Sequence, residues 1–267
     1  MSNKYIEISR VKLSVINKNG KTILDDVYFT SPFKVVPPFY KSDNFIKVII
    51  MSSSAGTMEG DVQCYDINLG DNTNMELTSQ SFEKIYTMVD EDAYRECNLT
   101  IGSNSLLKYN LLPVIPFKDS AFKSDIKISL KDKTSRLIFT DIINCGRVAY
   151  GEKFQYKYYK SYVEAQCNNR LIYLDNTIYK PSEMDMNNFG MYEGYTHFAN
   201  ILIVNFNRDE NLLTNIREVL NNDNIDGAAS FTQNQDISVK ILGHSADSLI
   251  KISEKISDIL LDSLKID

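Results

Sequence analysis

The sequence predicts a mainly β protein of helically wound or stacked β-sheets, with two α-helices in its C-terminal part. Segments of roughly 6 to 10 residues in which apolar and polar side chains alternate recur through the first two thirds of the chain. Glycine, asparagine and proline turn signals separate these segments. Helical periodicity is found only after residue 199, where two amphipathic stretches occur.

Composition sets limits on the function. The chain has 267 residues, of which 43 % are apolar and 24 % charged, as in an ordinary globular protein with a sizeable core. A net charge of −6 argues against nucleic acid and anionic membranes as partners. The N-terminus has no apolar signal region and no stretch is long enough to span a membrane. With four widely spaced cysteines, we expect reduced thiols and a cytoplasmic location.

The first 51 residues are predicted to form three strands. Alternation over residues 4–16 and 21–30 predicts two strands, which the Asn19-Gly20 pair joins as a hairpin. Prolines make the next segment extended and irregular, and we expect its aromatic residues in the core, namely Phe33, Phe39 and Tyr40. Residues 45–51 then form a buried strand.

The segment from Ser52 to Tyr86 is predicted to be a glycine-hinged hairpin. Glycines at 56 and 60 allow a positive φ or a close backbone approach. A strand over residues 62–69 places Tyr65, Ile67 and Leu69 on one face. After a turn at residues 70–72, a second strand presents a polar cluster, Thr78, Ser79, Gln80 and Ser81.

Further strands follow, and then the chain changes character. Segment 112–117 contains prolines that forbid a regular central strand. Residues 141–154 are interpreted as a strand-turn-strand unit, in which Arg147 binds a carboxylate such as Glu152 and so stabilises the turn. The other predicted elements are strands at 94–101, 105–111, 122–130, 136–145, 154–165 and 171–179, a loop at 181–198, and a C-terminal β-α-β-β-α portion. We expect a β-rich body over 1–198 and this portion, 199–267, packed on it in one continuous domain.

No catalytic motif is present. The chain lacks a G-x-S-x-G elbow, a Walker A loop, a Rossmann fingerprint and H-E-x-x-H. No motif surrounds His197 or His244, which we interpret as surface or capping residues rather than a zinc pair. We therefore predict that the protein is not an enzyme. A β-solenoid carbohydrate-active protein that uses a carboxylate pair is the alternative, because 35 acids supply many candidate pairs.

Three sequence blocks, taken in order, have a recognisable pattern. The first is Ala55-Gly56…Gly60-Asp61 followed by T-S-Q-S and Lys84-Ile85-Tyr86, the second is L-P-V-I-P-F at 112–117, and the third is Asp141…G-R-V-A-Y-G-E…Phe154. Together they resemble the urease accessory protein D family, most closely its H branch, over nearly the whole chain. Ser53-Ser54-Ala55 and Ser79 depart from the family pattern, which puts the geometry of the turn in doubt.

The resemblance implies a non-catalytic protein that acts in the insertion of nickel into urease. The partners that it implies are urease accessory protein F, the GTPase accessory protein G through F, and the urease subunits, in a dimeric heteromeric complex. Nickel in transit is implied, through an internal tunnel, with no tightly bound cofactor. The alternative is a plain protein-binding module without metal transit.

Residues for such a passage follow from ion chemistry together with the resemblance. A divalent ion in transit needs oxygen ligands that bind it weakly and release it. The candidates are Asp61 and Asp141 for the nickel route, Thr78, Ser79 and Gln80 as tunnel lining, and Arg147 and Glu152 as structural residues. The alternative interpretation is that these are satisfied polar residues that tie turns together. Residues 181–198 and the last helix are candidates for a partner interface.

Overall fold

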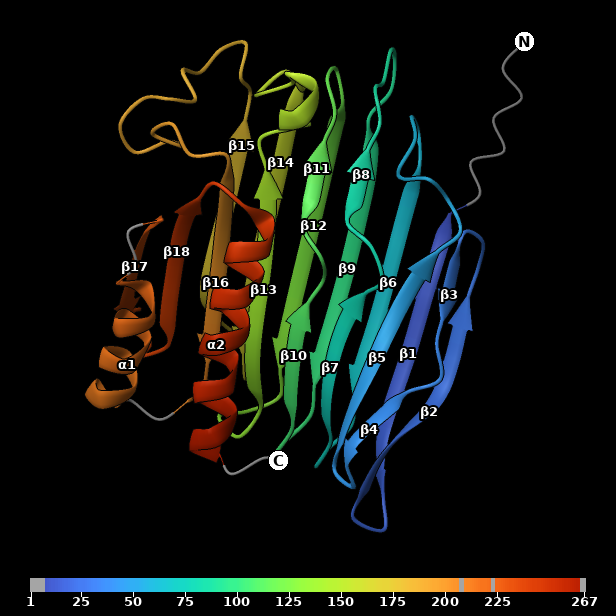
Figure 1. Cartoon of the computed structure of the whole chain (residues 1–267). Coiled ribbons are helices and arrows are strands. Elements are labelled where there is room, and N and C mark those ends of the chain that lie inside the picture. Colours follow the sequence, from blue (N-terminus) through green and yellow to red (C-terminus); the bar gives the residue numbers. More distant parts are fainter. Residues whose placement is uncertain (1–7, 207–208, 222–223, 265–267) are drawn as a thin grey trace.

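The computed structural model describes residues 8–206, 209–221 and 224–264, and in this part of the chain two β-sheets face each other across a shared core (Figure 1). The prediction of a mainly β protein with two C-terminal helices is confirmed. The first residues of the predicted strand 4–16 lie outside the described ranges. Among the described residues, no helix has the length and apolarity needed to cross a membrane.

The seven-stranded sheet is parallel in its centre and antiparallel at both edges. Its strands, in spatial order, are β15 (Arg170–Tyr179), β14 (Tyr158–Cys167), β12 (Ala121–Leu130), β9 (Ala93–Ile101), β6 (Val62–Leu69), β1 (Ser9–Lys18) and β2 (Lys21–Phe29). The predicted β1–β2 hairpin at Asn19-Gly20 is confirmed, because both turn residues have positive φ.

The eleven-stranded sheet faces the first one. Its main path consists of β17 (Ile225–Phe231), β18 (Ile237–Gly243), β16 (His197–Val204), β13 (Arg136–Asn144), β10 (Leu106–Asn110), β7 (Asn74–Ser79), β5 (Phe45–Ser52) and β3 (Phe33–Val35). Three short strands lie off this path, β4 (Phe39–Ser42), β8 (Glu83–Ile85) and β11 (Val114–Pro116). The prolines of segment 112–117 thus leave only a short strand there, as predicted.

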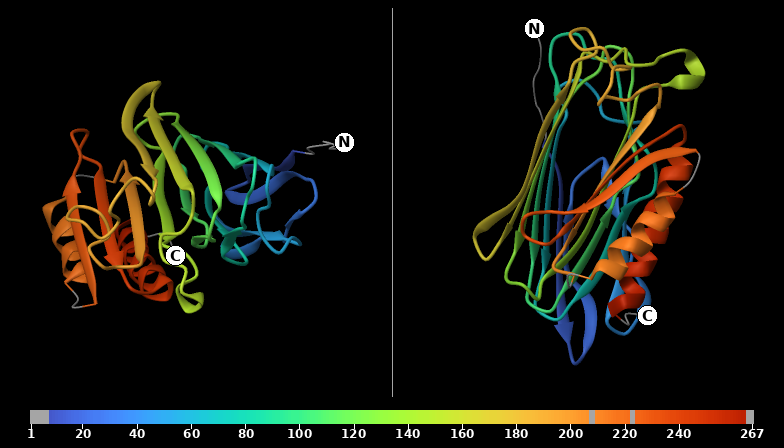
Figure 2. Two further views of the ribbon diagram at one scale, coloured as in Figure 1. Left: turned by 90° about the horizontal axis from the view of Figure 1, so that it is seen from above. Right: turned by 90° about the vertical axis from the view of Figure 1, so that its left-hand side faces the viewer.

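The chain winds helically, because it crosses repeatedly between the two sheets, as from β5 to β6, β6 to β7, β8 to β9 and β9 to β10. Each return places a strand parallel to the one a coil earlier, so that Leu106 of β10 pairs with Asn74 of β7 and with Arg136 of β13. The end-on view in Figure 2 shows the two sheets as separate layers. Apolar residues of both inner faces, such as Leu77 and Leu99, fill the space between them.

The predicted hairpin of residues 62–81 is wrong. β6 belongs to the seven-stranded sheet and β7 to the eleven-stranded sheet, so the turn at residues 70–73 carries the chain across the core. The carbonyl of Gly70 accepts hydrogen bonds from the hydroxyls of Thr73 and Ser105, which fix this crossing. Parallel neighbours from adjacent coils supply the ladder hydrogen bonds that a hairpin partner would have supplied.

Two helices cover one part of the outer face of the eleven-stranded sheet. α1 (Glu210–Leu220) and α2 (Ala246–Leu264) pack their apolar stripes on β13, β16, β17 and β18. Asp209 caps α1 by accepting a hydrogen bond from the backbone of Asn211. The predicted β-α-β-β-α order is thereby found, and pairing of β16 with β13 continues the sheet into it.

Two local predictions also fail. Phe33 is buried, but Phe39 and Tyr40 are 55 % and 61 % exposed, because β4 is an edge strand with no layer over either ring. The predicted strand-turn-strand unit at 141–154 is wrong, because β13 ends at Asn144 and residues 145–157 form no strand. They contain the single 3₁₀ turn η1 (Val148–Tyr150) and irregular backbone before β14 begins at Tyr158.

Candidate functional site

The eleven-stranded sheet is interrupted on one side of β13. β7 ends at Ser79 before β8 begins, and β10 ends at Asn110 before β11 begins. β13 runs straight past this gap, pairing Thr140 with Asn110 before the gap and Ile143 with Val114 after it. Asp141 therefore lies beside the gap between the end of β10 and the start of β11.

Asp141 shares its face of β13 with Leu137 and Phe139, which are part of the core between the sheets. Loss of hydration in this interior raises the pKa of the carboxyl to about 6, against an opposing effect of Arg95. The charge of Asp175 raises the pKa further. Asp141 is thus a carboxylic acid in an apolar setting that ionises near neutral pH.

A group of oxygen-bearing side chains surrounds this acid. Asn200 is its register partner on β16, and its amide donates to the phenol oxygen of Tyr173 at 3.2 Å. Tyr173 in turn contacts the Asp175 carboxylate at 3.3 Å, which also accepts from Thr177 and binds Lys240. Together, Asp141, Asp175, Asn200 and Tyr173 form one end of a polar layer between the sheets.

The other end of the polar layer contains a buried arginine. Arg95 of β9 donates from Nε to Gln63 at 3.1 Å and contacts the Glu83 carboxylate at 3.2 Å. Glu83 also accepts from Gln63 at 3.1 Å and from the Thr57 hydroxyl. The guanidinium lies beside the rings of Tyr65 and Phe122, so that its charge is held in an otherwise aromatic setting.

A small cavity connects the gap with this arginine. Its lining consists of Ile50, Tyr65, Ser79, Glu83, Arg95, Leu111 and Leu112. About 20 Å³ is open to the centres of water molecules, which is room for a single water. The loops at the gap thus leave a polar opening rather than a closed apolar wall.

The predicted site residues divide into two groups. Asp141 faces the polar layer and Ser79 lines the cavity, where its hydroxyl accepts from the backbone of Leu112. Thr78 lies on the outer face of β7 and Gln80 is exposed. The Asp61 carboxylate accepts from the backbone of Met58 at 2.7 Å, which stabilises its own loop.

Sequence reasoning missed Glu83, Arg95, Asp175 and Asn200. A signal for one of them was present, because Arg95 shares the inward face of β9 with Cys97, Leu99 and Ile101. A charged residue at such a position breaks the apolar alternation and indicates an internal polar contact. Asp175 and Asn200 come from distant strands, and only the fold brings them to Asp141.

Arg147 has the structural role that was predicted. Its Nε donates to Glu152 at 2.8 Å and a second guanidinium nitrogen binds the other carboxylate oxygen. Gly56 and Gly60 also fulfil their expected roles, since a Cβ on Gly56 would meet the Lys84 carbonyl oxygen at 2.4 Å and Gly60 has a φ of +77°.

Soft metal ligands are not gathered in the described part of the chain. No group of three or more His, Cys, Asp and Glu side chains is arranged to hold an ion there. Three of the four cysteines are buried, and burial raises the pKa of Cys97 and Cys145, to about 12 and about 11.

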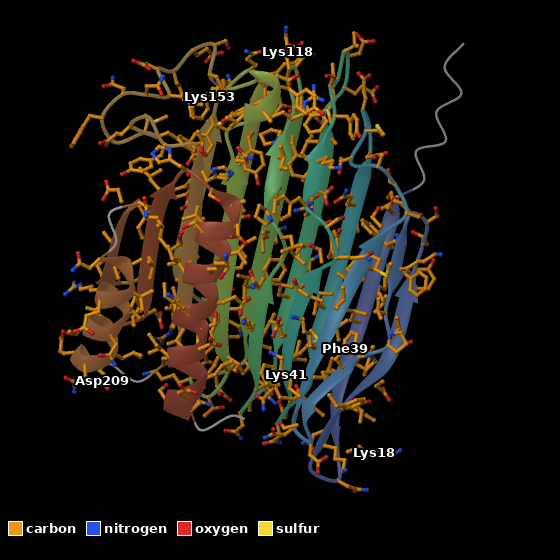
Figure 3. The ribbon with its side chains drawn as sticks, in the orientation of Figure 1. Lys18, Phe39, Lys41, Lys118, Lys153 and Asp209 are labelled. Atoms are coloured by element: carbon orange, nitrogen blue, oxygen red, sulfur yellow. The ribbon has the colours of Figure 1, made fainter. Side chains whose placement is uncertain are left out.

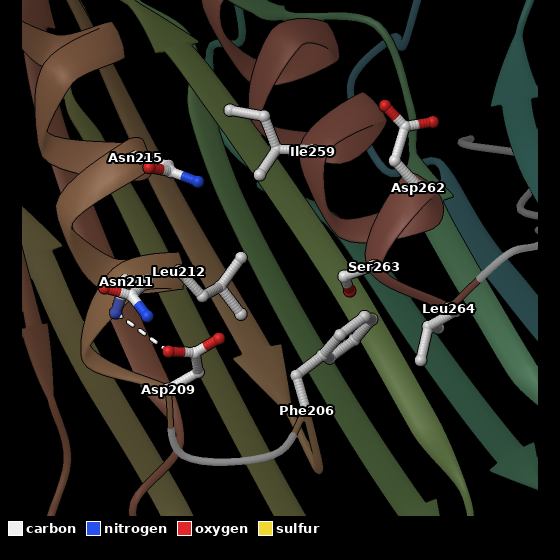
Figure 4. A pocket seen from close by; sticks show the side chains of 9 residues that line it. All are labelled: Phe206, Asp209, Asn211, Leu212, Asn215, Ile259, Asp262, Ser263 and Leu264. Atoms are coloured by element: carbon white, nitrogen blue, oxygen red, sulfur yellow. Dashed lines mark hydrogen bonds between the residues drawn. The ribbon is translucent and has the colours of Figure 1, made fainter.

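A larger cavity lies between the ends of the two helices (Figure 4). It has about 450 Å³ and includes Phe206, Leu212, Asp209 and Asp262. The Asp209 carboxylate is already occupied as the cap of α1, as the dashed line in Figure 4 shows. This cavity is separate from the polar layer, because the helices lie on the outer face of the sheet.

Comparison with known proteins gives a consistent result. The family model described as UreD urease accessory protein matches residues 8–264. Urease accessory protein UreH of Helicobacter pylori (strain G27) is 36 % identical over 257 residues, which cover 96 % of each chain. Urease accessory protein UreD of Acetivibrio thermocellus is 33 % identical over 262 residues, covering 97 % of this chain and 100 % of the relative.

Proposed function

Because the chain belongs to the UreD family of urease accessory proteins, we propose that it is a non-catalytic scaffold in urease maturation that gives nickel a passage between its two sheets. The passage would run along the polar layer, from the gap beside Ser79 to Asp141, Asp175 and Asn200. Carboxylate, amide and phenol oxygens hold a borderline divalent ion weakly enough to release it. The nickel ion is cargo in this proposal, and no resident cofactor is invoked.

The observation that carries the proposal is the position of Asp141. An ionised carboxylate in the protein interior destabilises the folded protein at neutral pH, and the raised pKa of Asp141 indicates this effect. The Asp141 carboxylate accepts no hydrogen bond among the described residues, so the fold itself gives no reason for an acid there. Attraction of a passing cation to the negative charge gives a reason for an acid at this position.

Arg95 sets a condition on this passage. Its charge repels a divalent cation, and the carboxylates of Glu83 and Asp141 offset that repulsion when both are ionised. Along the layer, the carboxylates of Glu83 and Asp141 lie near Arg95, and Asp175 beyond them is paired with Lys240, so that an ionised Asp141 leaves one net negative charge for the ion. The position of Asp141 and Asp175 between the sheets, rather than in an open groove, does not favour the carbohydrate-active alternative.

The partners follow from the same family membership. The relatives are named as urease accessory proteins, so we propose that this chain acts with other urease maturation proteins in the cytoplasm. In the proposed assembly it binds urease accessory protein F, reaches the GTPase accessory protein G through F, and docks on apo-urease. We place two copies of each in a heteromeric complex.

The test is the maturation of urease in cells that express the full set of maturation proteins. We expect Asp141→Asn to retain binding to accessory protein F and to apo-urease in a pull-down, but to lower the nickel content of purified urease several-fold. Asp61→Asn is the matched control, because its carboxylate serves its own loop. If urease matured with Asp141→Asn contained its full amount of nickel, the proposed passage would be wrong and the protein would be a protein-binding module without a metal route.

A further inference from the structure

A trough crosses the outer face of the eleven-stranded sheet at the end where α2 begins. Ile115, Asn144 and His197 lie side by side on β11, β13 and β16, since Asn144 pairs with His197 and Ile143 with Val114. The trough has about 480 Å³, and η1 and His244 complete its walls. It is distinct from the polar layer, which lies on the other face of the same strands.

The η1 turn holds one wall of the trough in a fixed shape. Gly146 has a φ of +134°, and a Cβ there would come within 2.3 Å of the carbonyl oxygen of Glu152. The Arg147 guanidinium binds Glu152 through both carboxylate oxygens and stacks on Phe117 at 4.1 Å. A side chain presented by this turn is therefore pre-organised for binding.

This rigid turn presents apolar side chains to solvent. Val148 is 42 % exposed and Tyr150 is 77 % exposed, although Tyr150 also lies 5.0 Å from the Arg147 guanidinium. An exposed tyrosine beside an arginine is a composition typical of the centre of a protein interface.

The surroundings of the trough are positively charged, although the whole chain has a net charge of −6. Lys84 is the register neighbour of Ile115, and Lys118 and Lys153 flank the η1 turn at the same end of the molecule (Figure 3). All three lysines are exposed, whereas the Glu152 carboxylate is already bound by Arg147. The N-terminal end of α2 follows His244, and the positive end of its dipole already has the Asp247 carboxylate in its first turn.

Uncharged polar groups line the floor. Nδ1 of His197 shares a hydrogen bond of 2.8 Å with the hydroxyl of Thr196, which orients the ring. Burial and the nearby His244 lower the pKa of His197 to about 4, so the ring is neutral at pH 7. His244 is held in place by stacking on Tyr195, with 4.6 Å between ring centroids.

We propose that this trough is a docking site for an extended segment of a partner protein that carries an acidic side chain next to an apolar one. The apolar side chain would pack against Tyr150, Val148 and Ile115, and the acid would face Lys84. Charge complementarity selects this occupant, because the site is basic on an acidic protein. The inference rests on the proposed function, in which the partner is a urease maturation protein or apo-urease.

Binding of the purified full-length protein to accessory protein F and to apo-urease tests the inference. Tyr150→Ser and Lys84→Glu are expected to weaken binding to one of the two about tenfold or more, and the effect of Lys84→Glu should shrink at high salt. Tyr40→Ser is the matched control, a tyrosine that is 61 % exposed on the edge strand β4, and should change affinity less than about twofold. Circular dichroism verifies that all variants fold.

The outcomes separate the two proposals. If the wild type binds a partner and both trough variants bind it as tightly, the docking site is wrong and the proposed function stands. If the wild type binds neither partner, the proposed function fails. Carbodiimide cross-linking gives a second measurement, in which Lys84, Lys118 or Lys153 should couple to carboxylates of the partner. Cross-links to a second copy of this chain instead would overturn the choice of occupant.

Discussion

At the scale of single residues, the interior of this protein is notable for charges where a β-sandwich needs none. Arg95 has 5 % of its surface exposed and is held by a hydrogen bond to Gln63 and an ion pair with Glu83. Asp141 differs, because burial raises its pKa and no hydrogen bond to its carboxylate offsets that effect in the described residues. Of the two, Asp141 is the residue whose charge destabilises the fold.

Asp141→Asn should therefore stabilise the protein at high pH. The pKa of the folded state lies near 6, above that of the unfolded chain, so stability is lost as the pH rises through about 6. We expect the variant to have a free energy of unfolding about 2 to 3 kcal/mol higher than the wild type at pH 8. Urea unfolding measures this difference, which should vanish near pH 4. A variant less stable at pH 8 would show that the carboxylate makes favourable contacts.

At the scale of elements, the η1 turn and helix α2 are fixed in different ways. η1 is held by backbone geometry at Gly146 and by the pair of Arg147 with Glu152. α2 is held by its apolar stripe and by Glu254, which binds the buried Lys108 at 2.5 Å and accepts from Asn110. The η1 wall of the trough is thus fixed independently of α2, which lies outside the lining of the trough.

Gly146→Ala should disturb the η1 wall of the trough without affecting α2. Both the positive φ and the contact of the new Cβ with the Glu152 carbonyl oxygen oppose the substitution, and we expect a loss of stability of roughly 1 to 3 kcal/mol. Gly151→Ala is the control, because it has a φ of +76° but no atom near its Cβ, so only backbone strain remains. Urea unfolding compares the two variants. An equal loss in both would mean that the close approach at Gly146 relaxes freely.

At the scale of the whole molecule, the alternation of side chains was enough to predict the class of fold. It placed Tyr65, Ile67 and Leu69 on one face of a strand, and in the structure this face is buried in the core. It could not tell a hairpin from a crossing between sheets at residues 70–73, because a Gly-Asp-Asn turn serves both and the difference lies in which distant strands supply hydrogen bonds.

The site was predicted only in part for the same reason. Asp141 and Ser79 were identified through the family pattern, and both face the interior or its cavity. Thr78 was not separable from Ser79 in the sequence, although a shift of one residue places it on the opposite face of β7. Asp175 and Asn200 reach Asp141 only through the pairing of β13 with β16 and the packing of the sheets.

The central claim is that an ionised Asp141 assists the passage of nickel, and its dependence on pH tests that claim most directly. Nickel transfer to apo-urease is measured with reconstituted wild-type and Asp141→Asn complexes between pH 5 and pH 8. The pKa of Asp141 is about 6, so its carboxylate is ionised at pH 8. We predict that the wild type transfers nickel several-fold faster than Asp141→Asn at pH 8, and that this difference between the two proteins disappears below pH 6. Equal rates for both proteins at every pH would contradict the account.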